Sequence, residues 1–168
     1  MARTSGARPL PGQSVILAVQ DQAGDCILAE GEHFNQQSDV AANDSDKTLT
    51  VPAGQTWVLQ FLAVKFISTA TVGNRQLRVE IGDGTNLLWF KNFGKVQAAS
   101  LTRYYHAASD LPDDTDFDSD GRIRMQLEAH VLPAGYTVRI YDSAAIAATA
   151  DDMEVRLIVD ERAAGSML

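Results

Sequence analysis

Apolar and polar residues alternate along much of this chain of 168 residues. Leu77, Val79 and Ile81, for example, are separated by polar residues, and the segments around positions 17, 123 and 157 follow the same two-residue period. Because successive side chains of a β-strand point to opposite faces, this period is typical of strands with one buried face. It predicts strands over residues 14–20, 26–30, 47–52, 55–68, 75–82, 86–91, 122–131, 136–142 and 153–160.

Two similar phrases stand where the alternation is interrupted, VPAG at 51–54 and LPAG at 132–135. Proline fixes φ and lacks a backbone donor, and the glycine two residues later permits a positive φ. Each phrase therefore predicts a hairpin turn that feeds a central strand. The alanine-rich stretch 143–152 predicts one short helical turn, and the polar stretches 31–46 and 92–121 predict long loops that carry specificity.

Many short strands separated by turn signals predict an all-β fold. We expect a jelly-roll-like antiparallel β-sandwich, in which the two similar phrases mark equivalent corners of two sheets. This sandwich is expected to form one domain over residues 13–168, preceded by an extended N-terminal arm over residues 1–12. Segment 55–66 is apolar on both faces, which predicts either a strand at the centre of a sheet or a strand covered by another subunit.

The composition and charge narrow the classes of function. Hydrophobic residues make up 45% and charged residues 21%, so wholesale disorder is not expected. The net charge of −8 repels phosphate and argues against a nucleic-acid partner. Residues 1–12 carry Arg3 and Arg8 and no acidic residue. This basic arm is either a contact for a neighbouring acidic subunit or a frayed terminus.

Targeting signals and disulfides are not expected. No apolar run approaches the roughly 20 residues that span a bilayer, so we expect no membrane partner. The N-terminal MARTSGARPLPG lacks the apolar region of a signal peptide, which predicts synthesis in the cytoplasm of the producing cell. Cys26 is the single cysteine and cannot form an internal disulfide.

One acidic stretch resembles a calcium loop. Asp116, Asp118, Asp120 and Gly121 match the beginning of the D-x-D-x-D-G pattern. The twelfth position, where that pattern requires glutamate, is Leu127. Calcium at this loop is therefore a weak candidate beside the alternative of a solvated acidic turn, and we expect no metal and no cofactor.

Residues suited to catalysis do not gather in recognisable motifs. The chain has no G-x-S-x-G, no S-x-x-K and no P-loop lysine, so we expect no enzymatic activity. His33 and His130 lie far from each other and lack zinc-site spacing. Tyr104, Tyr105 and His106 fall in an expected loop and are the candidate partner-binding residues of this region, together with Arg3 and Arg8 of the arm.

Three phrases of the chain resemble a known group of proteins. TLTVPAGQTW begins at position 48, TATVGNR at position 69 and RIYDSAAI at position 139. Over residues 48–82 and 131–161, the chain resembles small virion structural proteins of tailed bacteriophages. The resemblance implies a β-sandwich that coats or joins other virion parts without catalysis, and no catalytic residue is carried over.

From this resemblance we expect a capsid decoration (cement) protein, located in the virion. It would form a homo-oligomer, a trimer, and bind the major capsid protein across the joints between capsid subunits. A neck, tail or fibre component of the virion is the first alternative. A carbohydrate-binding β-sandwich module, using Tyr104, Tyr105 and calcium at residues 116–120, is the alternative from another class.

Overall fold

The structure, a computed structural model, describes residues 18–20, 26–28, 34–109, 111, 121–147 and 149–163. The chain divides into two compact units, residues 1–32 and residues 33–168, which we describe separately. The first unit contains an antiparallel pair, β1 (Ala18–Gln20) with β2 (Cys26–Leu28). The expected arm over residues 1–12 lies outside the described residues and stays a prediction.

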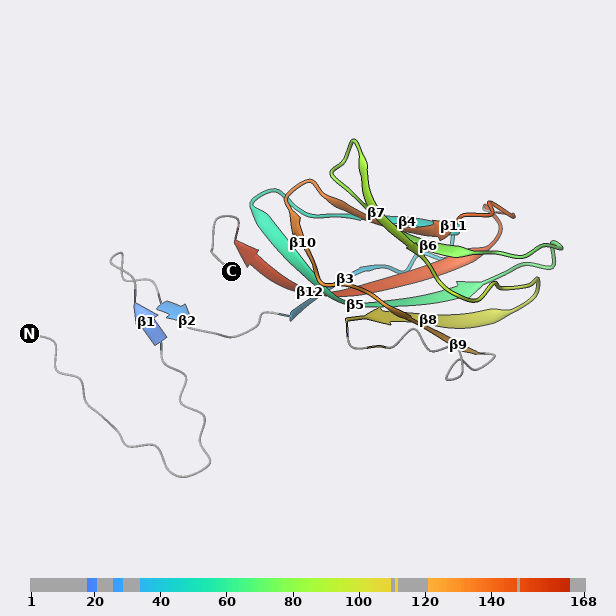
Figure 1. The fold of residues 1–168 in the computed structure, drawn as a ribbon, viewed down its shortest axis with the longest axis horizontal. Helices are drawn as coiled ribbons and strands as arrows, with labels where there is room; N and C mark the ends of the chain where they lie inside the picture. Colours follow the sequence, from blue (N-terminus) through green and yellow to red (C-terminus); the bar gives the residue numbers. More distant parts are fainter. Residues whose placement is uncertain are drawn as a thin grey trace, which may run out of the picture. The chain divides into compact units, whose positions relative to one another are not determined.

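The second unit is a two-layer β-sandwich, which confirms the all-β expectation (Figure 1). The large sheet contains β3 (Phe34–Asp39), β12 (Asp152–Ala163), β5 (Gln55–Ile67), β8 (Thr102–Ala108) and β9 (Arg122–Gln126) in this order, with β10 (His130–Pro133) also beside β5. The small sheet contains β4 (Asp46–Thr50), β11 (Thr137–Asp142), β6 (Leu77–Gly82) and β7 (Leu87–Asn92) in this order. The described strands pair antiparallel, except that β8 and β9 are parallel. The described residues contain no helix that could cross a membrane.

The alternation of apolar residues places the core between the two sheets. In β5, Leu62, Val64 and Phe66 are buried, while the residues between them are half-buried. β5 pairs with β12 along one edge and with β8 and β10 along the other, so the expectation of a central strand is confirmed. Trp57 lies in the core and Trp89 packs against it.

The two PAG phrases are corners between the sheets, and the prediction of hairpin turns is wrong. Gln55 N donates a hydrogen bond to Pro52 O (3.2 Å), and Tyr136 N donates one to Pro133 O (3.1 Å). The first turn carries the chain from β4 in the small sheet to β5 in the large sheet, and the second carries it from β10 back to β11. β4 pairs with β11, and β5 pairs with β10. The two strands that flank the first turn therefore pair with the two strands that flank the second turn. Local sequence specified the turn but not the pairing partner.

The glycines of these turns adopt positive φ angles, 79° at Gly54 and 85° at Gly135. A side chain at either position would force an L-residue into the left-handed region, which costs about 1–2 kcal/mol. We therefore expect Gly54→Ala and Gly135→Ala each to lower the free energy of unfolding by about 1–2 kcal/mol in urea titrations. Gly121→Ala is the matched control, because an added Cβ meets no atom there and φ is not strained. Equal stability losses in all three variants would contradict this account.

Several sequence expectations about loops are also wrong. The stretch 31–46 contains β3, and the stretch 92–121 contains β8. The described residues between 143 and 151 form turns and no helix, so the expected helical turn is wrong, and the expected strand 122–131 is divided into β9 and the start of β10. β3 was missed because this edge strand pairs through its backbone with β12 and carries mostly polar side chains.

Candidate functional site

The predicted partner-binding residues of the chain's middle lie in a strand, so their placement in a loop is wrong. Tyr104, Tyr105 and His106 belong to β8, and neighbouring residues of a strand face opposite ways. Tyr105 is fully buried, and its hydroxyl donates to Gln97 Oε1 (3.0 Å). Tyr105 therefore cannot contact a partner through its side chain. Tyr104 is 45% exposed and His106 half-buried, and both point away from the core.

Tyr104 and His106 are part of a broad surface, which we call the outer face of the large sheet. Strand register places Tyr104 between Lys65 and Arg122, and His106 between Ala63 and Arg124. The His106 ring stacks on Phe61, with centroids 5.7 Å apart. The surface is made of alternate residues from four strands: Phe61, Ala63 and Lys65 of β5, Tyr104 and His106 of β8, Arg122 and Arg124 of β9, and Glu154, Arg156 and Ile158 of β12. Aromatic and cationic side chains are thus brought together from distant parts of the chain.

The electrostatics of this face differ from the acidic character of the whole chain. Glu154 accepts a hydrogen bond from Lys65 Nζ (2.6 Å), so the cation neutralises this carboxylate. Arg122, Arg124 and Arg156 add positive charge around the aromatic row. A chain with a net charge of −8 therefore presents a locally cationic, aromatic sheet face. Such a surface is suited to a partner with acidic and apolar groups.

Burial lowers the pKa of His106, and the nearby guanidinium groups of Arg122 and Arg124 lower it further. We expect an NMR titration to give His106 a pKa below its ordinary value of about 6.5. The pKa of His106 is lower in the folded state than in the unfolded chain. The contribution of neutral His106 to stability is therefore complete above the unfolded pKa and is lost as pH falls through the folded pKa. Arg124→Gln should raise the pKa of His106, whereas Arg139→Gln on the other sheet should leave it unchanged. A His106 pKa above 6.5 in the native protein would contradict this arrangement.

A second exposed layer covers the small sheet, and most of its charged groups pair with one another. Arg139 lies over the Tyr141 ring (4.2 Å) and donates through Nε to Asp46 Oδ1 (2.9 Å). Arg78 lies over the Phe90 ring (4.7 Å). An open cleft of about 220 Å³ lies beside this layer and is lined by Glu80, Gly82, Gly84, Thr85, Asn86, Leu87, Thr137 and Arg139. The layer is thus a cross-strand ladder of cation–π and ionic contacts, with a polar cleft at its end.

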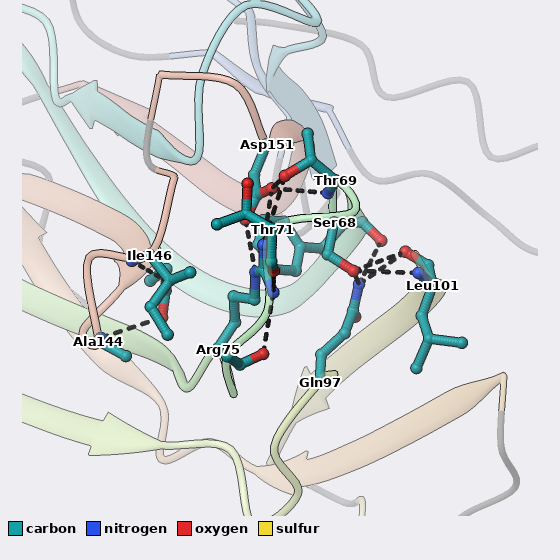
Figure 2. A network of polar contacts seen from close by, with 12 residues as sticks. Ser68, Thr69, Thr71, Arg75, Gln97, Leu101, Ala144, Ile146 and Asp151 are labelled. Carbon is teal, nitrogen blue, oxygen red and sulfur yellow. Dashed lines mark hydrogen bonds and ion pairs between the residues drawn. The ribbon is translucent and has the colours of Figure 1, made fainter. Parts of the chain in front are cut away.

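A buried ion pair joins Arg75, the last residue of the TATVGNR phrase, to Asp151, which directly precedes β12 (Figure 2). Arg75 Nε donates to Asp151 Oδ2 (2.7 Å), and both side chains have no exposed surface. Arg75 Nη1 also donates to the carbonyl oxygens of Thr71 (2.8 Å) and Gly73 (2.9 Å). Asp151 accepts two further hydrogen bonds of 2.7 Å, from the backbone N and the hydroxyl of Thr69. Burial raises the pKa of Asp151, but the hydrogen bonds from Arg75 and Thr69 outweigh it and lower the pKa.

The same end of the sandwich holds a second polar group, around Gln97 (Figure 2). Gln97 Nε2 donates to Leu101 O (2.8 Å) and to Ser68 Oγ (3.1 Å), while Gln97 Oε1 accepts from Tyr105. Burial raises the pKa of Tyr105 to about 12, so its hydroxyl stays protonated at neutral pH. These groups are enclosed and mutually bonded, so the network joins loops of the fold and is not a binding site.

Other predicted site residues fall outside the described residues. They are Arg3 and Arg8 of the arm and the calcium candidates Asp116, Asp118 and Asp120. Among the residues that the structure does describe, no three His, Cys, Asp or Glu side chains gather in a way that could hold a metal ion. His130 packs against Trp89, with ring centroids 4.7 Å apart.

Sequence reasoning missed Phe61, Arg124 and Arg156 as members of the outer face. The sequence did indicate that the outer side of β5 is apolar at Phe61, because segment 55–66 has apolar residues at both odd and even positions. The two arginines gave no signal, since an isolated arginine in a strand is typical of any solvated face. No protein-family model matches the chain, and a comparison with curated protein sequences finds no match.

Proposed function

We propose that this chain is a non-catalytic structural protein of a tailed-phage virion, a capsid decoration (cement) protein that binds across major capsid subunits. The observation that carries the proposal is the outer face of the large sheet, where exposed aromatic and cationic groups form a broad surface on an acidic chain. A broad sheet face suits a protein surface better than a small substrate, which needs a concave site. The resemblance of the three phrases to virion proteins supplies the class of partner.

The proposed mechanism is thermodynamic. A protein that binds only the assembled shell stabilises that shell by mass action. Repetition of the same contact over a symmetric particle adds avidity to each weak contact. Tyr104 and His106 provide the contact on the outer face, and Arg3 and Arg8 of the arm reach a neighbouring acidic subunit. The partners are the major capsid protein and other copies of this chain, for which a trimer is the expected assembly.

We also propose that the sandwich is a jelly roll, the architecture of many viral capsid domains. Strands β3 to β8, β11 and β12 can be numbered 1 to 8 along the chain, with β9 and β10 as an insertion. The large sheet then has the order 1-8-3-6 and the small sheet the order 2-7-4-5. This is the order that results when a long antiparallel hairpin is rolled into two sheets, and it supports the proposal.

The test is to mix the purified chain with undecorated shells of the phage that encodes it and to measure co-sedimentation and shell melting. We expect Tyr104→Ala and Arg156→Glu to weaken shell binding, and added salt to weaken it further. Arg78→Glu, on the small sheet, is the matched control and should bind normally. Unimpaired binding by both outer-face variants would refute the contact. Unimpaired binding after deletion of residues 1–12 would refute the role of the arm.

A neck, tail or fibre position in the virion remains the alternative within the same proposal. Copy number separates the two positions, because decoration covers the shell whereas a neck or tail ring has few subunits. Quantitative mass spectrometry of purified virions should give on the order of hundreds of copies for a decoration protein and about a dozen for a neck or tail ring.

A carbohydrate-binding module is a second candidate, and the polar cleft beside the small sheet favours it. Glu80, Thr137 and Arg139 offer a carboxylate, a hydroxyl and a guanidinium in a cleft of about 220 Å³, which is suited to a single sugar unit. Glycan-array binding that is lost in Glu80→Gln and kept in Tyr104→Ala would support this site. The absence of any glycan signal would remove it.

A further inference from the structure

His130 forms a contact between the two sheets, where β10 of the large sheet meets β7 of the small sheet. Register places His130 opposite Leu59 of β5, which is buried in the core, so the imidazole also points between the sheets. There the ring packs against Trp89 of β7, with centroids 4.7 Å apart and 55° between the ring planes. Within the described part of the chain, β7 pairs only with β6 and β10 only with β5. The imidazole therefore joins two strands that each have a single neighbour.

The Nε2 atom of His130 is buried and has no hydrogen-bond partner among the described residues. A neutral imidazole fits such a place because one of its nitrogens carries no proton, whereas both nitrogens of an imidazolium are donors. Trp57 lies diagonal to His130 on the core side of the sheet, and its buried Nε1 is itself a donor that cannot accept a hydrogen bond. Protonation would therefore bury a charged donor without an acceptor, which costs folding free energy.

We propose that neutral His130 is a pH-sensitive contact that holds β7 against β10, and that its protonation separates the two strands at mildly acidic pH. Nearby, Lys91 Nζ of β7 donates to Gln126 O (3.0 Å), so β7 also meets the segment that leads into β10. Because each strand has one neighbour in the described part of its sheet, both should fray once the ring contact is lost. Trp89 would then be exposed beside Phe90, which is already 52% exposed, so acid would enlarge the apolar surface of β7.

The charged groups around His130 act in opposite directions. Burial lowers the pKa of His130, and the carboxylate of Glu128 in the preceding link raises it by a smaller amount. From β7, the ammonium of Lys91 points to the same link, and a cation there favours the neutral ring. From β5, the opposed residue is the uncharged Leu59. Because the folded-state pKa is below the unfolded value of about 6.5, the contribution of neutral His130 is complete above that pH and is lost as pH falls through the folded pKa.

Hydrogen exchange of the purified chain tests this inference, which does not depend on the virion proposal. Protection factors are compared between about pH 7.5 and about pH 5, because they correct for the intrinsic pH dependence of exchange. We expect the protection of β7 and β10 to fall below about pH 6.5, by at most about tenfold per pH unit, since a single proton is taken up. The central strands β5 and β12 should keep their protection along the part that does not face β10. Equal losses in those strands would indicate global unfolding and overturn the proposal.

Two variants identify the titrating group. His130→Phe keeps an aromatic ring against Trp89 but has no titratable nitrogen, so its protection of β7 should be constant over the same pH range. His106→Phe is the matched control, because it removes the histidine of the outer face and should leave the response of β7 unchanged. A response of β7 that persists in His130→Phe would overturn the proposal.

The pKa of His130 itself, measured by NMR titration, provides a test that needs no change at the ring. It should lie below about 6.5 in the native protein. Glu128→Gln, at an exposed position, should lower this pKa further and move the midpoint of β7 fraying to lower pH by the same amount. A structural role alone would leave that midpoint in place. A native pKa of 6.5 or above, as a cation–π contact between the imidazolium and Trp89 would produce, would overturn the proposal.

Discussion

Asp151→Asn is expected to lower the free energy of unfolding by about 3–5 kcal/mol, a large share of the stability of a domain of this size. The substitution preserves the shape of the side chain but removes its charge. Arg75 would then be a fully buried cation without a counter-charge, and the desolvation penalty of its guanidinium would no longer be offset. Guanidinium chloride titration at neutral pH measures the change directly.

Two further variants isolate the buried pair. Asp46→Asn breaks the exposed contact with Arg139 and should cost no more than about 1 kcal/mol, because solvent screens that pair. Arg75→Met/Asp151→Asn should be less destabilised than the sum of the two single variants, since neither buried charge remains. An Asp151→Asn variant as stable as Asp46→Asn would show that the buried pair does not hold these loops together.

The same pair makes stability depend on pH in a defined direction. The pKa of Asp151 is lower in the folded state than in the unfolded chain. Its contribution is therefore complete above the unfolded pKa of about 3.9 and is lost as pH falls through the folded value. Comparison of the native protein with Asp151→Asn between neutral pH and about pH 3 should show the difference between them shrinking only in the acidic part of this range.

The alternation of apolar residues was sufficient to predict most strands of the sandwich. It located β6, β11 and β12 because each has one face in the core and one towards solvent, whereas β5 was located by its apolar run. It failed for β3, whose sequence FNQQSD has almost no apolar residue. Asn35 and Gln37 of β3 donate to Glu161 Oε2. Polar contacts therefore hold β3 against β12, whereas the other strands are held by apolar packing. A pattern based on burial cannot find a strand that is held mainly by its backbone and polar side chains.

The candidate site depends on strand pairing, which the local sequence does not contain. Tyr104 and Tyr105 look alike in the sequence, yet one is exposed and the other is in the core. Their difference follows from parity once β8 is known to be a strand. The proximity of Phe61 to His106 follows from the register of β5 with β8, two segments separated by about forty residues. The buried pair of Arg75 and Asp151 was also missed, because isolated charged residues usually indicate a solvated surface.

Gly73→Ala is expected to lower the free energy of unfolding by about 2–4 kcal/mol. An added Cβ would lie 2.4 Å from Ile146 Cδ1 and 3.2 Å from its Cγ2, so Ile146 would have to move. The φ angle of 147° at Gly73 adds strain for any residue with a side chain. Gly73 belongs to TATVGNR and Ile146 to RIYDSAAI. The close contact between them explains why a residue without a side chain stands in one phrase opposite isoleucine in the other.

Ile146→Ala provides the test of that explanation. Alone it should cost about 1 kcal/mol, because the side chain is only half-buried. Combined with Gly73→Ala it should recover about 1–2 kcal/mol relative to the sum of the single variants, since the clash disappears and only the strain in φ remains. Additive losses in the two variants would mean that Gly73 is required for its backbone conformation alone. A recovery would show that the two phrases pack against each other through Gly73 and Ile146. Arg75, which pairs with Asp151, also donates a hydrogen bond to Gly73 O at this place.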